Sequence, residues 1–326
     1  MHPIPTTLRS RPLAIVASAV LVTGAVSLAT APPASAAFES SPVGFASLNG
    51  GTTGGAGGAT VTVTTAAALD TALQSTARQT IRVQGMISLT GMHRVQSNKS
   101  ILGVGSASGL TGGGLNISGT SNIIIRNMNF RNADDDSINV QESAHNIWID
   151  HNDLSNGHDG LVDIKRGSDF VTVSWNHFHN HDKTALLGHS DDNSAQDLGH
   201  LRVTYVHNWF DGTTQRHPRV RFANPVHVLN NYYNGNGGYG IASTENAGVL
   251  SERNSFENVS HPTVTQTGDS DPGNLRVLND QMVGSGTEQV RNGASVAAIP
   301  YSYTPTAAAN VKRDVTAGAG VGKIGL

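Results

Sequence analysis

The chain has 326 residues, of which 37 are glycine, none is cysteine and only 14% are charged, and its formal net charge is −3. The absence of cysteine excludes disulfides, cysteine-ligated zinc and thiol catalysis, and the small, balanced charge argues against a nucleic-acid-binding protein, which needs a basic face. The glycines lack the three-residue period of collagen. Abundant Gly, Asn, Ser, Thr and Val with few aromatic residues favour a large, turn-rich β protein.

Residues 1–36 have the pattern of a secretory signal peptide. Arg9 and Arg11 precede an apolar stretch from Leu13 to Leu28, and residues 34–36 read Ala-Ser-Ala, a small-residue cleavage pattern. A membrane anchor is the alternative, but the apolar run is short and is followed by two prolines. Cleavage after residue 36 leaves 19 Lys+Arg against 24 Asp+Glu, a net charge of −5. No later stretch is apolar enough to span a bilayer, so we expect residues 37–326 to be a secreted, soluble, extracellular protein.

Two short segments come before the strand-like part of the chain. Residues 50–58 are rich in glycine, but no Gly-Lys-Ser/Thr follows, which argues against a phosphate-binding loop. Thr65 then precedes residues 66–77, in which Leu69 and Leu73 lie one helical turn apart. This pattern predicts one short, capped amphipathic helix.

The sequence is strand-like from Ile81 and repeats from residue 122. Six segments of alternating β residues end at intervals of 24, 24, 32, 23 and 23 residues, in Phe130, Leu154, Phe178, Phe210, Tyr233 and Phe256. In five of them an asparagine stands two residues earlier: Asn152, Asn176, Asn208, Asn231 and Asn254. A fixed period of this length indicates a stacked architecture, and the lack of an amphipathic helix between the segments favours a solenoid of strands.

In a parallel β-helix, like positions on successive coils stack about 4.8 Å apart. The recurring asparagines could then form a hydrogen-bonded ladder, with the aromatic residues stacked inside. A β-propeller would need about 40 residues per blade, and a β-sandwich with chance similarity is the remaining alternative. We therefore predict that residues 37–326 form an all-β, right-handed, single-stranded parallel β-helix with the short helix as an N-terminal cap.

Three aspartates are spaced to meet on neighbouring coils. Asp136 and Asp159 are 23 residues apart, which is one coil, and Asp163 follows four residues later, on the same side if the segment is a strand. Three carboxylates in one place repel one another unless a cation joins them, and hard oxygen ligands suit Ca²⁺. The alternative is that these residues are exposed loop acids.

Basic residues follow at similar intervals. Lys183 comes 20 residues after Asp163, and Arg216 comes 33 residues after Lys183, which matches the longer coil. With Arg219 and Arg221 they would form a cationic patch beside the acids. This arrangement indicates a site for an anionic ligand bridged to the protein through a cation, whereas the alternative is a set of surface ion pairs, each of which contributes little.

Two further groups invite a catalytic or metal-binding interpretation. His177, His179 and His181 alternate and could share a face, which raises zinc as a possibility, but they straddle a strand end and no H-E-x-x-H motif is present. Asp150 and His151 could form a dyad, but no serine lies in a nucleophile-elbow context. We expect that pair to have a structural role at a coil corner.

Seven motifs together resemble the pectate lyases of polysaccharide lyase family 1. In chain order they are Trp148–His151, Asp159–Asp163, Val171–Asn176, Lys183, Arg216–Arg221, Asn230–Tyr233 and Ala319–Lys323. Each motif is of moderate specificity, but their order and spacing over residues 44–323 are highly specific. The resemblance implies a right-handed parallel β-helix that cleaves polygalacturonate by β-elimination with Ca²⁺.

The resemblance also implies a role for each matching residue. Asp136, Asp159 and Asp163 would bind Ca²⁺, with Asp134 as an additional ligand; Arg216 would be the base, and Lys183 and Arg221 would hold substrate carboxylates. The link between Asp150 and Asp159 is shorter than in many relatives, which leaves the groove wall on this side and the chain-length preference open.

The chemistry of such a reaction agrees with these residue types. The C5 proton of the sugar lies next to a carboxylate, and neutralising that carboxylate stabilises the charge that grows in the transition state. An arginine base is unusual because a guanidinium normally stays protonated, so it needs cationic neighbours such as Lys183 and Arg221. We therefore predict an alkaline optimum, with Lys183 as the second candidate for the base.

Three other functions remain open from the sequence. A pectin lyase acts on methyl-esterified pectin and would not need the three aspartates and Lys183. A polygalacturonase would hydrolyse with paired carboxylates and no metal. A non-catalytic extracellular carbohydrate-binding β-helix would give no reason for cations and acids to share a face. The expected partner is the pectin polysaccharide, with no nucleic acid and no membrane, and we expect a monomer.

Overall fold

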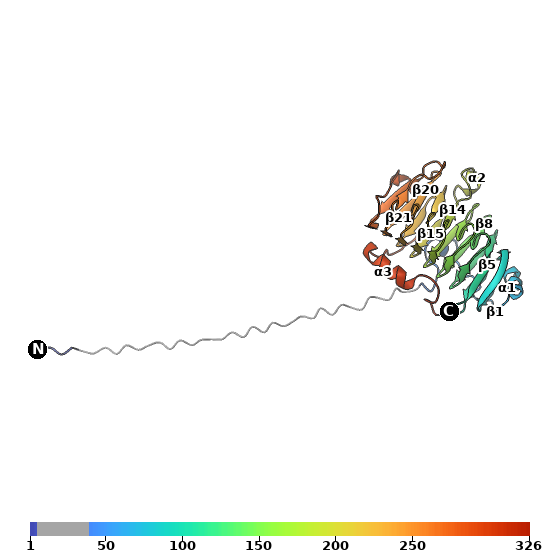
Figure 1. The fold of residues 1–326 in the computed structure, drawn as a ribbon, viewed down its shortest axis with the longest axis horizontal. Coiled ribbons are helices and arrows are strands. Elements are labelled where there is room, and N and C mark those ends of the chain that lie inside the picture. Colours follow the sequence, from blue (N-terminus) through green and yellow to red (C-terminus); the bar gives the residue numbers. More distant parts are fainter. Residues whose placement is uncertain (5–38) are drawn as a thin grey trace. The chain divides into compact units, whose positions relative to one another are not determined.

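The computed structural model describes residues 1–4 and 39–326. Apart from its first four residues, the expected signal peptide lies outside the described residues. Residues 39–326 wind into a right-handed parallel β-helix, which confirms the predicted fold (Figure 1). In the described part of the chain, no helix has the length and apolar character needed to cross a membrane.

Each coil contributes one strand to a ten-stranded parallel sheet. Its strands, in spatial order, are β1 (Ala59–Val63), β2 (Gln79–Val83), β4 (Lys99–Gly103), β6 (Ser121–Arg126), β9 (His145–Asp150), β12 (Asp169–Ser174), β15 (Val203–Val206), β18 (Val226–Leu229), β21 (Gly248–Glu252) and β24 (Asn274–Leu278). Successive strands pair in register, so residues about one coil apart in sequence become neighbours.

A second sheet has two rows of short strands that share β5 (Gly109–Ser118), which also pairs with β3 (Met86–Arg94). The first, called the β11 row, contains β8 (Ile138–Gln141), β11 (Val162–Ile164), β14 (Ala185–Leu187), β17 (Arg219–Arg221), β20 (Ile241–Thr244) and β23 (Thr263–Val264). The other, called the β13 row, contains β7 (Asn129–Arg131), β10 (Asp153–Ser155), β13 (His177–His179), β16 (Trp209–Asp211), β19 (Tyr232–Asn234), β22 (Ser255–Glu257) and β25 (Gln281–Val283).

The predicted capping helix is α1 (Ala66–Gln74), and the side chain of Thr65 accepts a hydrogen bond from the Ala68 amide, 3.3 Å away. The helix ends three residues earlier than predicted because Ser75 takes an extended conformation, with ψ of 135°. The buried Lys99 ammonium donates to the carbonyl oxygens of Ser75 and Ala77 at this end. Burial lowers the pKa of Lys99.

The other helices are η1 (Gly44–Ser47), α2 (Ser194–Asp197), η2 (Gly293–Ser295) and α3 (Ala308–Gly318). The short α2 lies in the coil with the 32-residue spacing, which accounts for its extra length. The sequence reasoning did not predict α3. It packs on the outside of the β13 row, where Val311 and Val315 join Trp175 and Tyr232 in a separate apolar cluster.

The repeated residues stack inside the coils as predicted. In the β13 row, Leu154 pairs with Phe130 and Phe178. The rings of Phe178, Phe210, Tyr233 and Phe256 follow with successive centroid distances of 5.1, 5.0 and 4.3 Å. All of these side chains are fully buried, so the repeat forms a continuous core.

The predicted asparagine ladder is also present. The ladder runs through Asn152, Asn176, Asn208, Asn231 and Asn254. At each step the backbone amide and the side-chain Nδ2 of one asparagine donate to the Oδ1 of the asparagine on the next coil, at 2.8–3.0 Å. Met128, which stands in place of an asparagine, still donates its backbone amide to Asn152. The ladder ends at Asp280, which accepts from the Asn254 amide.

Candidate active site

The proposed ligands and cations lie within the short strands of the β11 row or in the segments that lead into them. Asp136 precedes β8, Asp163 is the middle residue of β11, Lys183 precedes β14, and Arg216 precedes β17. Because these strands pair in register from coil to coil, side chains separated by tens of residues come together on one face. Arg221 is the last residue of β17.

Asp136 and Asp163 form the buried centre of this face, with 3% and 2% of their surfaces exposed. Burial and the charge of Asp136 raise the pKa of Asp163 to about 7, against opposing effects of Lys165 and Arg216. Burial also raises the pKa of Asp136. Two such carboxylates are stable together as anions only when a cation lies near them.

Lys165 provides a cation that the sequence reasoning missed. Its ammonium lies 3.3 Å from Asp136 Oδ2 and 3.7 Å from Asp163 Oδ2. The sequence spacing could have identified Lys165, because it follows Asp163 by two residues and therefore projects to the same side of the chain. Lys165 balances part of the negative charge of the pair.

Asp159 differs from the other two acids in its surroundings. It lies before β11, in a turn, so the same-strand argument for pairing it with Asp163 is wrong. Its half-exposed carboxylate accepts a hydrogen bond from Lys183 at 3.0 Å, and this bond lowers the pKa of Asp159. Asp159 is nevertheless close to the pair, because single carboxylate oxygens of Asp135, Asp136 and Asp159 lie within 4.8 Å of one another.

The neighbouring acid Asp134 is directed elsewhere. Its Oδ2 accepts a hydrogen bond of 2.7 Å from the Gly91 amide in β3. The structure thus groups Asp135, rather than Asp134, with Asp136 and Asp159. Sequence spacing could not distinguish these adjacent acids.

The donor set fits a hard divalent cation. The available atoms are carboxylate oxygens, which Ca²⁺ and Mg²⁺ prefer as ligands. Two of the carboxylates are buried, and the ammonium of Lys165 is the cation close to both. A dication at this place would favour ionised Asp136 and Asp163, which their burial opposes. Asp136, Asp159 and Asp163 would hold such an ion, with Asp135 as a further candidate.

The arginines continue the face on the next coil. Arg216 has a left-handed backbone, with φ of 65°, and its buried Nε makes no hydrogen bond to the described residues. Arg221 is largely buried and is held by the Asp191 carboxylate and the Gly188 carbonyl. Burial raises the pKa of Asp191, but the hydrogen bond from Arg221 acts in the opposite direction, and the pKa is lowered overall. Asp191 lies in a loop, and no sequence pattern linked it to Arg221.

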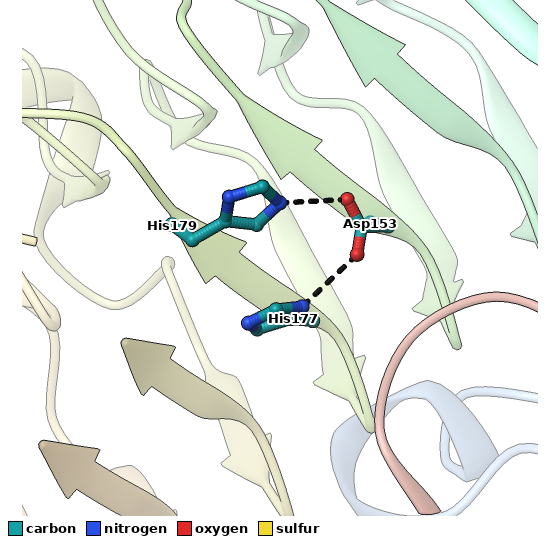
Figure 2. Close-up of side chains that lie close together, drawn as sticks. All are labelled: Asp153, His177 and His179. Carbon is teal, nitrogen blue, oxygen red and sulfur yellow. Dashed lines mark hydrogen bonds and ion pairs between the residues drawn. The ribbon is translucent and has the colours of Figure 1, made fainter. Parts of the chain in front are cut away.

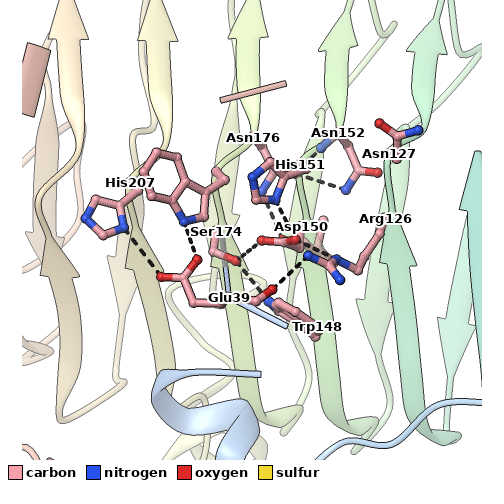
Figure 3. Close-up of polar contacts among 12 residues, drawn as sticks. Glu39, Arg126, Asn127, Trp148, Asp150, His151, Asn152, Ser174, Asn176 and His207 are labelled. Atoms are coloured by element: carbon pink, nitrogen blue, oxygen red, sulfur yellow. Dashed lines mark hydrogen bonds and ion pairs between the residues drawn. The ribbon is translucent and has the colours of Figure 1, made fainter. Parts of the chain in front are cut away.

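Asp150 and His151 lie at the end of β9 in the ten-stranded sheet, not in the β11 row (Figure 3). Both side chains are fully buried, and Asp150 accepts hydrogen bonds from His151, Ser174 and Arg126. Arg126 also lies over the ring of Trp148, 4.3 Å from its centroid. These contacts tie three successive coils together at the corner, as expected of a structural role.

Comparisons with known proteins consistently find pectate lyases. A family model described as pectate lyase matches residues 10–324. The chain is 41% identical over 277 residues to pectate lyase plyB of Emericella nidulans, covering 82% of this chain and 84% of that protein. It is 38% identical to a pectate trisaccharide-lyase of Bacillus licheniformis, covering 93% of this chain and 95% of that protein.

A solved structure of similar fold is also a pectate lyase. The structure of pectate lyase Bsp165PelA from Bacillus sp. N165 in complex with trigalacturonate is similar with a TM-score of 0.78 and 31% sequence identity. The match covers 87% of this chain and 99% of that one. The likeness therefore extends over nearly the whole β-helix.

Proposed function

The chain belongs to the pectate lyase family and is a polysaccharide lyase, and from this premise we propose that it is a secreted enzyme that cleaves α-1,4-linked polygalacturonate by Ca²⁺-dependent β-elimination. The observation that carries the proposal is the face of the β11 row, where Asp136, Asp159 and Asp163 lie beside cations from the next coils. The trigalacturonate bound to the related structure supports an acidic galacturonate substrate.

The cations of this face suit a polyanionic chain. Lys183, with 41% of its side chain exposed, can bind a galacturonate carboxylate in exchange for its contact with Asp159. Arg221 is already oriented by Asp191 and presents a fork that matches a second carboxylate. Bound Ca²⁺ would neutralise the carboxylate next to C5 and so favour loss of the C5 proton.

Arg216 is the proposed base. Its guanidine takes the C5 proton, the C5–H electron pair becomes the C4–C5 double bond, and the bond from C4 to the glycosidic oxygen breaks. That oxygen leaves with a proton from water, giving a 4,5-unsaturated oligogalacturonate. Lys183 is the weaker candidate because Asp159 accepts a hydrogen bond from its ammonium, whereas Arg216 Nε makes no hydrogen bond to the described residues.

The test is to incubate the protein with polygalacturonate and follow the ultraviolet absorbance of the unsaturated product. We expect absorbance with Ca²⁺, loss of it with chelator, and recovery when Ca²⁺ is restored. Arg216→Lys should lower turnover by about 10²- to 10⁴-fold, and Asp163→Asn should raise the Ca²⁺ requirement. Lys312→Gln, on α3, is the matched control and should behave as wild type.

Other results would support the alternatives. Chelator-resistant absorbance seen only on methyl-esterified pectin would indicate a pectin lyase, and new reducing ends without absorbance would indicate hydrolysis. Binding of polygalacturonate without either product would indicate a carbohydrate-binding β-helix. Export with cleavage after residue 36 predicts Ala37 as the first residue of the protein recovered from the culture medium, which N-terminal sequencing measures.

A further inference from the structure

A second cluster of ligand-type side chains lies on the β13 row, away from the β11 row. His177 and His179 flank the buried Phe178 in β13, so both imidazoles point outward. Asp153, in register with His177 on the adjacent strand β10, points to the same side. Figure 2 shows the two rings converging on this one carboxylate.

We propose that Asp153, His177 and His179 bind a divalent transition metal ion such as Zn²⁺. Asp153 Oδ2 lies 3.0 Å from His177 Nδ1, and Asp153 Oδ1 lies 2.9 Å from His179 Nε2. One ligand atom from each residue falls within 4.8 Å of the others. This spacing suits three ligands around one ion with bonds of about 2.0–2.2 Å.

The surroundings orient the imidazoles as in established zinc sites. A metal-binding histidine usually donates its other ring N–H to a carboxylate, and His177 Nε2 lies 3.3 Å from the Asp211 carboxylate of β16. The His177 ring also stacks between Trp209 and His179, with centroid distances of 4.3 and 4.5 Å. His177 therefore has both a fixed plane and an outer partner.

The cluster is also open enough for an ion to enter. The side chains of Asp153, His177 and His179 are 14%, 19% and 21% exposed, which leaves room for water as a further ligand.

Arg131 is the competing cation at this cluster. Its guanidinium pairs with Asp153 Oδ1 and donates to the Asp153 carbonyl. A metal bound through Oδ2 leaves this pair in place, so Arg131 can act as an outer partner of the ligand carboxylate. The structural alternative is an ion-pair network of Arg131, Asp153 and protonated histidines with no metal.

The ligand types separate this site from the proposed Ca²⁺ site. Two imidazoles and one carboxylate favour Zn²⁺ and neighbouring transition metals, whereas Ca²⁺ takes oxygen ligands. The ion would link β10 to β13 directly, and it would link β13 to β16 through the contact of His177 with Asp211. It would therefore connect three successive coils. The inference is independent of the proposed lyase activity.

The experiment uses the full chain without a polyhistidine tag, stripped with chelator and then dialysed with excess Ca²⁺. Zn²⁺ is titrated at constant pH, the bound metal is measured by mass spectrometry, and the dissociation constant is measured by calorimetry. We expect one Zn²⁺ per chain in the presence of Ca²⁺. His177→Gln and His179→Gln should each weaken binding by more than about 100-fold, and Asp211→Asn by about 10- to 100-fold.

His93→Gln is the matched control, because His93 in β3 pairs with a single carboxylate, Asp70, outside any such group. It should bind Zn²⁺ as wild type does. Co²⁺ bound to the wild-type protein should give visible absorption bands, a readout of the site that needs no variant, and His179→Gln should lack these bands. Wild-type affinity in both histidine variants, or no stoichiometric metal in the wild-type protein, would overturn the proposal.

Discussion

Gly160 lies against the two buried carboxylates of the proposed active site, where a larger residue would not fit. Its amide donates a hydrogen bond of 2.8 Å to Asp136 Oδ1. A Cβ at this position would lie within 3.0 Å of an Oδ1 atom of both Asp136 and Asp163. The absence of a side chain therefore lets the two acids approach each other.

Gly160→Ala should displace these carboxylates and lower turnover by about 100-fold at limiting Ca²⁺, because small displacements of catalytic groups have effects of this size. The measurement is the rate of product absorbance over a series of Ca²⁺ concentrations, with circular dichroism as a check on folding. Gly293→Ala, whose added Cβ would meet Arg276 at an ordinary 3.5 Å, should leave the rate unchanged. A wild-type Ca²⁺ response in Gly160→Ala would contradict the prediction.

His217 supports the segment that carries Arg216. Its fully buried ring lies between the Tyr239 carbonyl and the Thr213 hydroxyl, each 2.8 Å from a ring nitrogen. Burial lowers the pKa of His217 to about 4, below the value of about 6.5 for an exposed histidine. The native state thus holds this imidazole neutral.

The stability of the protein should therefore fall as the pH drops from about 6.5 to about 4. In this window the unfolded chain binds a proton at residue 217 that the folded chain does not, and the effect reaches about 3 kcal/mol when complete. Denaturant unfolding at pH 7, 6, 5 and 4 measures it. His217→Gln should have a shallower pH dependence, because only other largely buried groups such as His207, whose pKa burial also lowers to about 4, then contribute.

The control for this effect is His200→Gln, because the His200 side chain is 50% exposed. It should keep the pH dependence of the wild type. An unchanged slope in His217→Gln would show that this residue does not titrate as its burial indicates.

At the scale of the elements, the corner between the ten-stranded sheet and the β13 row is built the same way on six successive coils. A residue with left-handed φ of 49–58° precedes the ladder position each time: Asn127, His151, Trp175, His207, Asn230 and Arg253. Such a backbone costs about 1–2 kcal/mol for residues other than glycine, asparagine or aspartate. The buried ladder next to it offsets this cost with hydrogen bonds that only the bent backbone permits.

Asn176→Ala should destabilise the protein by about 3 kcal/mol, because each buried polar group left without a partner costs about 1–3 kcal/mol. Asn176 Oδ1 accepts from the Asn152 amide, and its Nδ2 donates to the Asn208 Oδ1 atom on the next coil, so the change removes partners on both sides. The free energy of unfolding from guanidinium titration checks this. Asn310→Ala, at a half-buried position of α3, should lie within about 0.5 kcal/mol of the wild type.

At the scale of the whole molecule, the charge is unevenly distributed. The chain carries a net charge of −3, yet Lys183, Arg216, Arg219 and Arg221 gather on β17 and in the segments that lead into β14 and β17. Arg219 is half-buried and donates to Ser270. This local patch allows a negatively charged protein to attract a polyanion.

The KM for polygalacturonate should therefore rise when NaCl increases from about 20 mM to about 500 mM, because salt screens exposed charges over a shorter distance. We expect kcat to change less. Lys183→Gln should have a higher KM at low salt and a weaker salt dependence, whereas Lys312→Gln should respond as the wild type. A KM independent of salt would argue against electrostatic attraction at this face.

The β-helix was predictable because its register turns sequence spacing into contact. Asn176 and Asn208 are 32 residues apart, but in-register stacking of parallel strands makes them direct neighbours, so the repeat alone indicated the ladder. The same coil spacing, 23 residues, placed Asp159 near Asp136. Helix α3 was missed because it lies outside the repeat and is held by contacts with the outer surface of the β13 row, among them its packing on Trp175 and Tyr232.

The sequence by itself determined the coil period, the stacked core, the ladder and a set of acids and cations on neighbouring coils (Asp136, Asp159, Lys183 and Arg216), because all of these follow from one repeated strand register. Only the tertiary structure decided which side chains within that set meet. It directed Asp134 to Gly91 and placed Lys165 beside Asp136 and Asp163. Turn conformation and loop length set these directions, and neither follows a period in the sequence.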